Sequence, residues 1–182
     1  WSSDVCSSDL LQGFVEYRLL DLHLHTMQIH SLMRQRLPVE AQNIPQQNLL
    51  NFLQLADYCT VNDYEAQMLQ ERTGKKLDAL AKLVKAIVVT MGAKGAVVHA
   101  GGKQIEIPSV TPDAVLDPTG CGDAFRGGLL YGLASGADWE MTGRLASLMG
   151  SLKIAFRGGQ NHRIGRDEIA DRFRRAFNMK LW

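Results

Sequence analysis

The sequence contains few cysteines, and they form no recognisable framework. Cys6, Cys59 and Cys121 are widely spaced, odd in number and include no Cys-x-x-Cys pair. Such a pattern argues against a disulfide-stapled secreted domain and fits a reducing compartment. We therefore expect a cytoplasmic protein.

Long apolar runs and an excess of charge are also missing. No apolar run reaches the ~20 residues that a membrane-spanning helix needs, so we expect no membrane segment. The net charge is only +1, which gives no basis for binding nucleic acid. The 182 residues, 46% of them hydrophobic, suit one domain with a good core, and nothing in them indicates an oligomeric state.

The first ten residues differ from an ordinary protein start. They lack an initial Met, repeat Ser-Ser-Asp, and have no basic flank before an apolar region as a signal peptide would. The string is similar to translated sequencing-adapter sequence. We predict that residues 1–35 are an atypical segment, artefactual or disordered, and that residues 36–182 form the domain.

From about residue 45 onward, strand and helix patterns alternate. We expect strands at 58–61, 86–90, 96–99 and 103–107, and helices at 49–55, 62–69, 77–84, 122–135, 139–156 and 167–177. The segment 86–90 is apolar throughout, as in a strand covered on both faces. The alternation predicts an α/β fold with a mostly parallel sheet flanked by helices.

The most informative segment is 117–128. Gly120, Cys121 and Gly122 place backbone N–H groups at the start of a helix, where an anion can approach closely. Asp123 follows in the first turn, beside that anion. A carboxylate at this place is explained if it accepts a proton from a hydroxyl group that attacks a bound phosphoryl group. We therefore predict that Asp123 is the catalytic base and that the three preceding residues neutralise developing charge.

This segment resembles the second signature of the ribokinase (PfkB-type) carbohydrate kinase family, Asp-Thr-x-Gly-Ala-Gly-Asp-x-Phe-x-x-Gly. The matching residues are Asp117, Thr119, Gly120, Cys121, Gly122, Asp123, Phe125 and Gly128. Pro118 stands between Asp117 and Thr119, and Cys121 replaces the usual Ala, but neither change affects a site built from main-chain N–H groups. A glycine-rich turn that only caps a helix is the alternative, and the complete set of matches argues against it. The resemblance covers residues 45–182 and implies a ribokinase-like fold fragment, the C-terminal nucleotide-binding part of such a kinase.

Two further segments are similar to the nucleotide site of that family. Thr90, Gly92 and Gly95 match its Thr-x-Gly-x-x-Gly loop, whose glycines let the main chain approach a nucleotide. A tight β-turn is the alternative there. Asn161 matches a loop that flanks the adenine base. The resemblance thus implies that ATP is a cofactor and that these four residues line its binding site.

Asn62 and Glu65 open a helix directly after a strand. In the ribokinase family an Asn-x-x-Glu motif lies near the triphosphate and its Mg²⁺, and an amide with a carboxylate suits that ion. The same spacing also forms a capping box, and both interpretations can hold. Asp117 and Thr119 match family positions that contribute oxygens near a monovalent cation, so K⁺ is a further candidate cofactor.

The resemblance implies an ATP-dependent kinase acting on a hydroxymethyl group of a sugar or nucleoside. The sequence of residues 120–128 and the Gln-Asn-His at 160–162 favour a bacterial adenosine kinase, with ribokinase and fructokinase as alternatives. Family members carry the substrate-binding residues in their N-terminal half. The identity of the small-molecule substrate is therefore left open, and we expect this fragment alone to be inactive.

Two other functions compete with the kinase. His23 and His25 lie at i and i+2, with His30 nearby, and could bind one metal as in a metal-dependent hydrolase. The chain is short for a barrel of ~250 residues, and later strands supply no comparable ligands. A non-catalytic nucleotide-binding relic is the second alternative, against which the intact Asp123 argues. The sequence has no Gly-x-x-x-x-Gly-Lys-Ser/Thr segment, which excludes a P-loop kinase.

Overall fold

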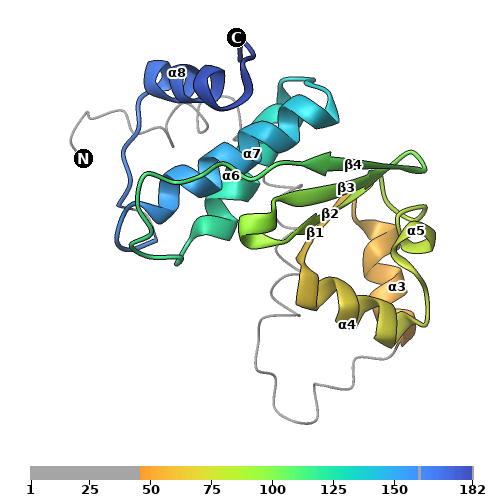
Figure 1. Cartoon of the computed structure of the whole chain (residues 1–182). Helices are drawn as coiled ribbons and strands as arrows, with labels where there is room; N and C mark the ends of the chain where they lie inside the picture. Colours follow the sequence, from red (N-terminus) through yellow and green to blue (C-terminus); the bar gives the residue numbers. More distant parts are fainter. Residues whose placement is uncertain (1–45, 160, 182) are drawn as a thin grey trace, which may run out of the picture. The chain divides into compact units, whose positions relative to one another are not determined.

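The computed structural model describes residues 46–159 and 161–181 (Figure 1). These residues fall into two compact units. We call residues 46–91 with Ala96–Glu106 the sheet unit, and Gly92–Gly95 with residues 107–181 the helical unit. No helix in these ranges is both long and apolar enough to cross a membrane.

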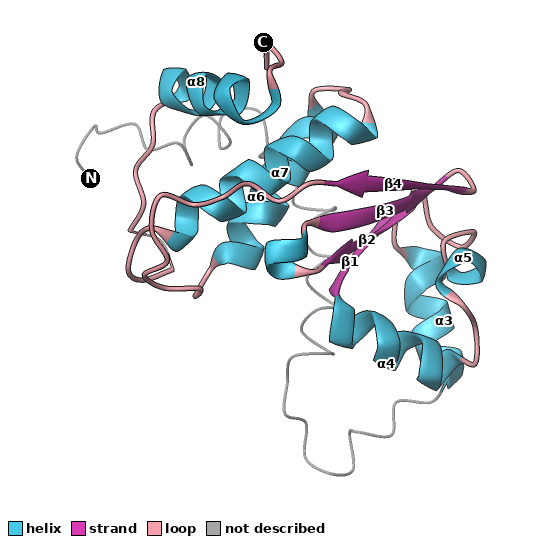
Figure 2. Ribbon diagram, viewed as in Figure 1, coloured by secondary structure: helices cyan, strands magenta, loops and turns pink. Residues whose placement is uncertain are grey.

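Within the described residues, the sheet has four strands in the order β1-β2-β3-β4 (Figure 2). They are β1 Tyr58–Asn62, β2 Ala86–Thr90, β3 Ala96–Ala100 and β4 Lys103–Ile107. β1 pairs with β2 in parallel, which sets Asn62 opposite Thr90, and β2 pairs with β3 in antiparallel orientation. The α/β fold predicted from the alternation of strands and helices is confirmed, and within the described strands its parallel part is the β1–β2 pair.

Three helices of the sheet unit share a core with these strands. They are α3 Gln46–Leu55, α4 Asp63–Thr73 and α5 Leu77–Leu80. Leu53, Leu69 and Leu80, one from each helix, join Ile87 of β2 in a buried apolar cluster. The sheet unit therefore has its own hydrophobic core.

The helix predicted at 77–84 is wrong in its length, because α5 ends at Leu80. Leu83 and Val84 still pack against the core of the sheet unit. They do so from a turn, after which the Lys85 N–H donates to the Asp57 carbonyl at 2.8 Å. The spacing of apolar residues in this segment therefore indicates which side chains are buried, and it does not indicate a continuous helix.

The helical unit contains α6 Cys121–Ala134, α7 Trp139–Ile154 and α8 Arg166–Phe177, with a short 3₁₀ turn, η2, at Gly92–Lys94. α6 and α7 approach closely at two glycines. A Cβ atom on Gly128 would lie 2.8 Å from the Cα of Ala146, and one on Gly132 would lie 2.6 Å from Oγ1 of Thr142. These contacts explain why a helix interior keeps two glycines despite their low helix propensity.

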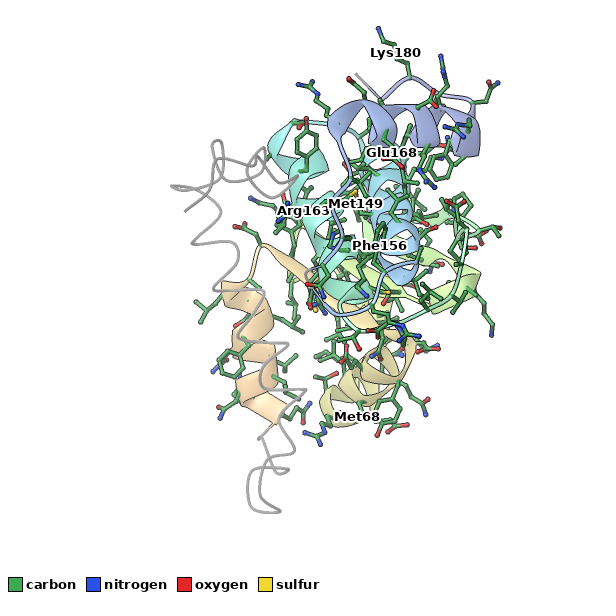
Figure 3. The ribbon with its side chains drawn as sticks, turned by 90° about the vertical axis from the view of Figure 1, so that its left-hand side faces the viewer. Met68, Met149, Phe156, Arg163, Glu168 and Lys180 are labelled. Carbon is green, nitrogen blue, oxygen red and sulfur yellow. The ribbon has the colours of Figure 1, made fainter. Side chains whose placement is uncertain are left out.

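The opposite side of α7 packs against α8. Leu145, Leu148 and Leu152 of α7 form a second core with Ile169 and Phe173 of α8. Figure 3 shows side chains along this unit, with Met149 on α7 and Phe156 just past its end. Because α7 is covered from two sides, Leu152 and Lys153 in its last turn are buried as well.

Candidate active site

The turn before α6 has the form of an anion-binding turn. Gly120 caps the helix in the left-handed region, at φ 82° and ψ 0°. A Cβ atom there would lie 2.9 Å from the carbonyl oxygen of Gly159, so only glycine fits. The Cys121 N–H donates to the Pro118 carbonyl at 3.2 Å. We call residues 117–123 the anion turn.

The free donors of this turn differ slightly from the predicted ones. Because the Cys121 N–H is used within the turn, it is not available to a ligand in this structure. The N–H groups of Gly120, Gly122 and Asp123 have no acceptor among the described residues. They lie at the N-terminus of a helix of 14 residues, where the helix dipole favours a negative charge.

Asp123 lies in the first turn of α6, as predicted. Its side chain is 69% exposed, so it can be reached from solvent. Nη1 of Arg126, one turn further on, donates to its Oδ1 at 2.7 Å. The guanidinium also lies beside Gly122, since a Cβ atom there would be 3.9 Å from both terminal nitrogens. Arg126 therefore brings a positive charge to the Asp123 carboxylate and to the anion turn together.

Asp117 is held by backbone donors on both carboxylate oxygens. The Gly158 N–H donates to Oδ2 at 2.7 Å and the Thr119 N–H to Oδ1 at 2.9 Å. These hydrogen bonds, that from Gly158 foremost, lower the pKa of Asp117 to about 2. Its carbonyl oxygen in turn accepts a hydrogen bond from Nζ of Lys153 at 3.0 Å. The oxygens of Asp117 are thus occupied by protein donors and do not fit the predicted K⁺ site.

Asn62 and Glu65 form a complete capping box at the start of α4. Oδ1 of Asn62 accepts from the Glu65 N–H at 2.8 Å, and Oε2 of Glu65 accepts from the Asn62 N–H at 2.9 Å. Glu65 is 8% exposed, whereas Asn62 is exposed. No described residue binds the second carboxylate oxygen of Glu65, so the capping role leaves that oxygen available.

Thr90 lies beside Asn62, because the two residues are partners at the carboxyl ends of parallel strands. Its hydroxyl donates to the Val61 carbonyl at 3.4 Å. The sheet unit thus brings together one residue predicted for the nucleotide and one predicted for Mg²⁺.

The glycines that follow β2 have different roles. Both have positive φ, 57° at Gly92 and 90° at Gly95. A Cβ atom on Gly95 would lie 2.1 Å from the carbonyl oxygen of Ile107, whereas one on Gly92 would meet nothing within 4 Å. Gly95 therefore serves packing, and the open surroundings of Gly92 leave room for a ligand.

Asn161 closes a short loop after α7. Its Nδ2 donates to the Arg157 carbonyl at 3.1 Å, and its side chain is exposed. The neighbouring His162 is partly buried rather than a surface histidine, and its ring lies 6.4 Å from that of Phe156. Its Nδ1 atom is buried and has no hydrogen-bond partner among the described residues. Burial, and after it the charge of Lys153, lowers the pKa of His162.

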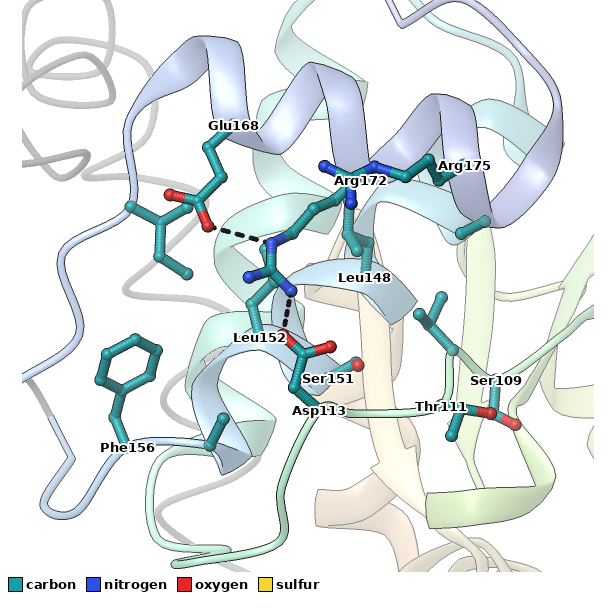
Figure 4. A pocket seen from close by; sticks show the side chains of 14 residues that line it. Ser109, Thr111, Asp113, Leu148, Ser151, Leu152, Phe156, Glu168, Arg172 and Arg175 are labelled. Atoms are coloured by element: carbon teal, nitrogen blue, oxygen red, sulfur yellow. Dashed lines mark hydrogen bonds and ion pairs between the residues drawn. The ribbon is translucent and has the colours of Figure 1, made fainter.

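A cavity of about 460 Å³ lies elsewhere in the helical unit, between loop 109–113, α7 and α8 (Figure 4). Arg172 of α8 lies at its side. Its Nε donates to Glu168 at 3.0 Å and its Nη1 pairs with Asp113. None of the predicted site residues lines this cavity, and it is therefore separate from the anion turn.

The rival metal motif, His23 and His25 with His30, lies outside the described residues. Within the described ranges, no three His, Cys, Asp or Glu side chains are grouped as metal ligands. His99 of β3 pairs with Asp78, with Nδ1 and Oδ1 3.1 Å apart.

Comparison with known protein families and sequences gives consistent matches. Residues 5–164 match the family described as pfkB family carbohydrate kinase. The nucleoside kinase of Methanocaldococcus jannaschii is 30% identical over 134 residues, which cover 72% of this chain and 44% of that protein. The ribokinase of Bacillus subtilis is 34% identical over 116 residues, or 64% of this chain and 39% of that protein.

Among solved structures, the nucleoside kinase of Burkholderia thailandensis in complex with inosine matches with a TM-score of 0.74. It is 46% identical, and the match covers 76% of this chain and 46% of that one. The same enzyme has also been solved with ADP-inosine. The chain therefore spans less than half the length of these relatives. Because the family match begins at residue 5, it extends into residues 1–35, and the boundary placed at residue 35 stays a prediction.

Proposed function

Because this chain belongs to the pfkB family of carbohydrate kinases, we propose that it is the nucleotide-binding part of an ATP-dependent phosphotransferase acting on a hydroxymethyl group. The observation that carries the proposal is the start of α6. There, N–H groups without partners in the described chain lie next to the exposed carboxylate of Asp123. Donors for an anion and an acceptor for a proton are the two groups that phosphoryl transfer to an alcohol requires.

In the proposed reaction, Asp123 accepts the proton of the attacking hydroxyl. The N–H groups of Gly120 and Gly122 stabilise the negative charge that develops on the transferred phosphoryl group. Arg126 must release Oδ1 of Asp123 for this step. Since its guanidinium already lies beside Gly122, an arriving phosphate offers it a second, bidentate partner. Bound ATP supplies the phosphoryl group.

The residues of the sheet unit are assigned to the nucleotide and its metal. Mg²⁺ neutralises phosphate charge, and it keeps several waters while taking few protein ligands. The second carboxylate oxygen of Glu65 suits such a water-mediated contact, and Asn62 lies at the exposed end of the same capping box. We assign Thr90, Gly92, Gly95 and Asn161 to the nucleotide, Gly95 through its main chain, because its packing against Ile107 admits no side chain.

We further propose that the acceptor is a nucleoside, with adenosine as the first candidate. The relative from B. thailandensis, at 46% identity, is a nucleoside kinase solved with inosine. The match to the B. subtilis ribokinase has lower identity, at 34%, so ribose is the second choice. The described cysteines, Cys59 and Cys121, are free thiols, which is compatible with the cytoplasm.

The test of the proposed function is the substitution Asp123→Asn in the gene product that carries this sequence. We expect turnover with adenosine to fall by orders of magnitude and the Kd for Mg·ATP to stay nearly constant, because the base acts only in the transition state. Asp167→Asn is the matched control, since Asp167 is also an exposed aspartate in the first turn of a helix. If Asp123→Asn kept more than about a tenth of wild-type turnover, worth ~1.4 kcal/mol of barrier, Asp123 would not be the base.

A further inference from the structure

Lys153, in the last turn of α7, is a buried lysine whose ammonium group, among the described residues, donates to carbonyl oxygens alone. Its relative exposure is 0%. Nζ donates to the carbonyl oxygens of Asp117 at 3.0 Å and of Phe156 at 2.9 Å. No carboxylate of the described chain forms an ion pair with it. Removing an ammonium group from water costs several kcal/mol unless it is well coordinated, so a packing role alone does not explain a lysine here.

The two carbonyl groups belong to segments that build the anion turn. Asp117 begins that turn, and Phe156 begins the loop after α7. The segments also meet where the Gly158 N–H binds the Asp117 carboxylate at 2.7 Å, and where Gly120 approaches Gly159 so closely that no side chain fits. The ammonium group of Lys153 therefore binds both segments. The contact between these segments positions the backbone N–H donors at the start of α6.

A single positive charge held by main-chain carbonyl oxygens is also how proteins bind K⁺, whose hydration shell such oxygens replace. At Asp117 that place is already filled. Both carboxylate oxygens accept backbone N–H groups and the carbonyl oxygen accepts Nζ of Lys153. The Asp117 carbonyl oxygen thus binds a covalently attached cation, and the two carboxylate oxygens bind backbone N–H groups.

We propose that Lys153 is a positioning residue whose ammonium group replaces a bound monovalent cation between the Asp117 and Phe156 carbonyls. The anion turn of this chain therefore forms without added K⁺. Lys153 does not touch the reacting atoms; it acts through the main chain of residues 117–120. The consequence for nucleotide binding rests on the proposed function, whereas the consequence for folding does not.

The experiment compares the wild-type chain with Lys153→Met in equal concentrations of KCl, NH₄Cl and choline chloride. Met matches the length of the apolar stem but removes the charge. We expect the melting temperature of the wild type to be the same in all three salts. The variant should melt at a lower temperature in choline chloride and should regain part of the difference in KCl or NH₄Cl, because these ions fit the vacated carbonyl site. Lys180→Met, at an exposed position of the same unit, should respond to no salt.

A second measurement is the Kd for Mg·ATP. Lys153→Met should weaken the binding of Mg·ATP by about tenfold in choline chloride and by less in KCl. A tenfold change in Kd corresponds to ~1.4 kcal/mol. Lys153→Gln keeps a hydrogen-bond donor without the charge and should show the same rescue, which keeps the test open if the Met variant does not fold. A wild type that needs K⁺, or variants whose losses neither cation reverses, would overturn the proposal. If the wild type binds no Mg·ATP, the proposed function fails, and the melting experiment still decides the role of Lys153.

Discussion

At the scale of single residues, glycine is required at position 120 for two separate reasons. Its φ of 82° is strained for any residue with a side chain, and a Cβ atom would lie 2.9 Å from a backbone oxygen of Gly159. Cys121, which replaces the alanine usual in the family, has no such constraint. Burial raises the pKa of its thiol, which lowers the fraction of reactive thiolate.

His162 makes the stability of the chain depend on pH. Burial and the charge of Lys153 lower its pKa in the folded state below the ordinary value of about 6.5. The unfolded chain therefore binds the proton more readily. The free energy of unfolding should decrease as the pH falls from about 6.5 towards the folded-state pKa, and this contribution should be lost at lower pH.

The measurement is urea denaturation at a series of pH values for the wild type and His162→Gln. The difference between the two proteins removes the contribution of the other histidines. We expect the variant to show a flatter dependence between pH 6.5 and the folded-state pKa. A variant whose free energy of unfolding parallels that of the wild type throughout this range would show that His162 is solvated like an ordinary histidine.

At the scale of elements, the α6–α7 contact depends on the absence of side chains on one face of α6. Gly128 and Gly132 lie one helical turn apart and both meet α7, at Ala146 and Thr142. Gly127, on another face, would place a Cβ atom within 4 Å of none of the described residues. Within α6, packing against α7 therefore requires glycine at Gly132 but does not require it at Gly127.

Gly132→Ala and Gly127→Ala should change stability in opposite directions. At Gly132 the new Cβ would lie 2.9 Å from the backbone Cα of Thr142, so α7 must move, and overpacking of this kind costs about 1–3 kcal/mol. At Gly127 the substitution should stabilise by about 0.5–1 kcal/mol through helix propensity. Urea midpoints of both variants give the comparison. Equal effects of the two changes would mean that the helices do not pack as closely as described.

At the scale of the whole molecule, each unit has its own core, and the predicted site residues are divided between the units. Asn62, Glu65 and Thr90 belong to the sheet unit, and the anion turn belongs to the helical unit. The chain also spans only 44% of the M. jannaschii relative and 46% of the B. thailandensis structure.

We therefore expect the chain as printed to bind Mg·ATP but to phosphorylate adenosine, ribose and fructose slowly at most. In-line transfer needs the acceptor hydroxyl held near the γ-phosphate, and such positioning contributes about 7–11 kcal/mol. Calorimetric titration with Mg·ATP and a coupled kinase assay on the three acceptors measure the two properties. Robust turnover on any acceptor would show that this chain carries a complete substrate site, contrary to our expectation.

The sequence by itself determined the elements whose signals are local. Strands 86–90 and 103–107 were predicted with their observed bounds, and the three helices of the helical unit within two residues. Asp138 caps α7 by accepting the Met141 N–H at 2.8 Å, and Asn62 caps α4. Caps and glycines with positive φ act within a few residues, so they can be recognised without the rest of the fold. The position of the Asp123 carboxylate directly after Gly120 and Gly122, whose N–H groups have no acceptor among the described residues, follows from the same local order.

Only the tertiary structure decided what surrounds that turn. Lys153 lies 36 residues from Asp117 in the sequence, and Gly158 lies 41 residues from it, yet both bind Asp117. The lysine among the apolar residues near the end of α7 is the one indication of the contact between Lys153 and Asp117. Nothing in the sequence identifies the carbonyl groups that this lysine binds. The same holds for Leu83 and Val84, which reach the core from a turn. Contacts of this kind arise when segments distant in the chain close around a shared core, and no periodicity within a segment records them.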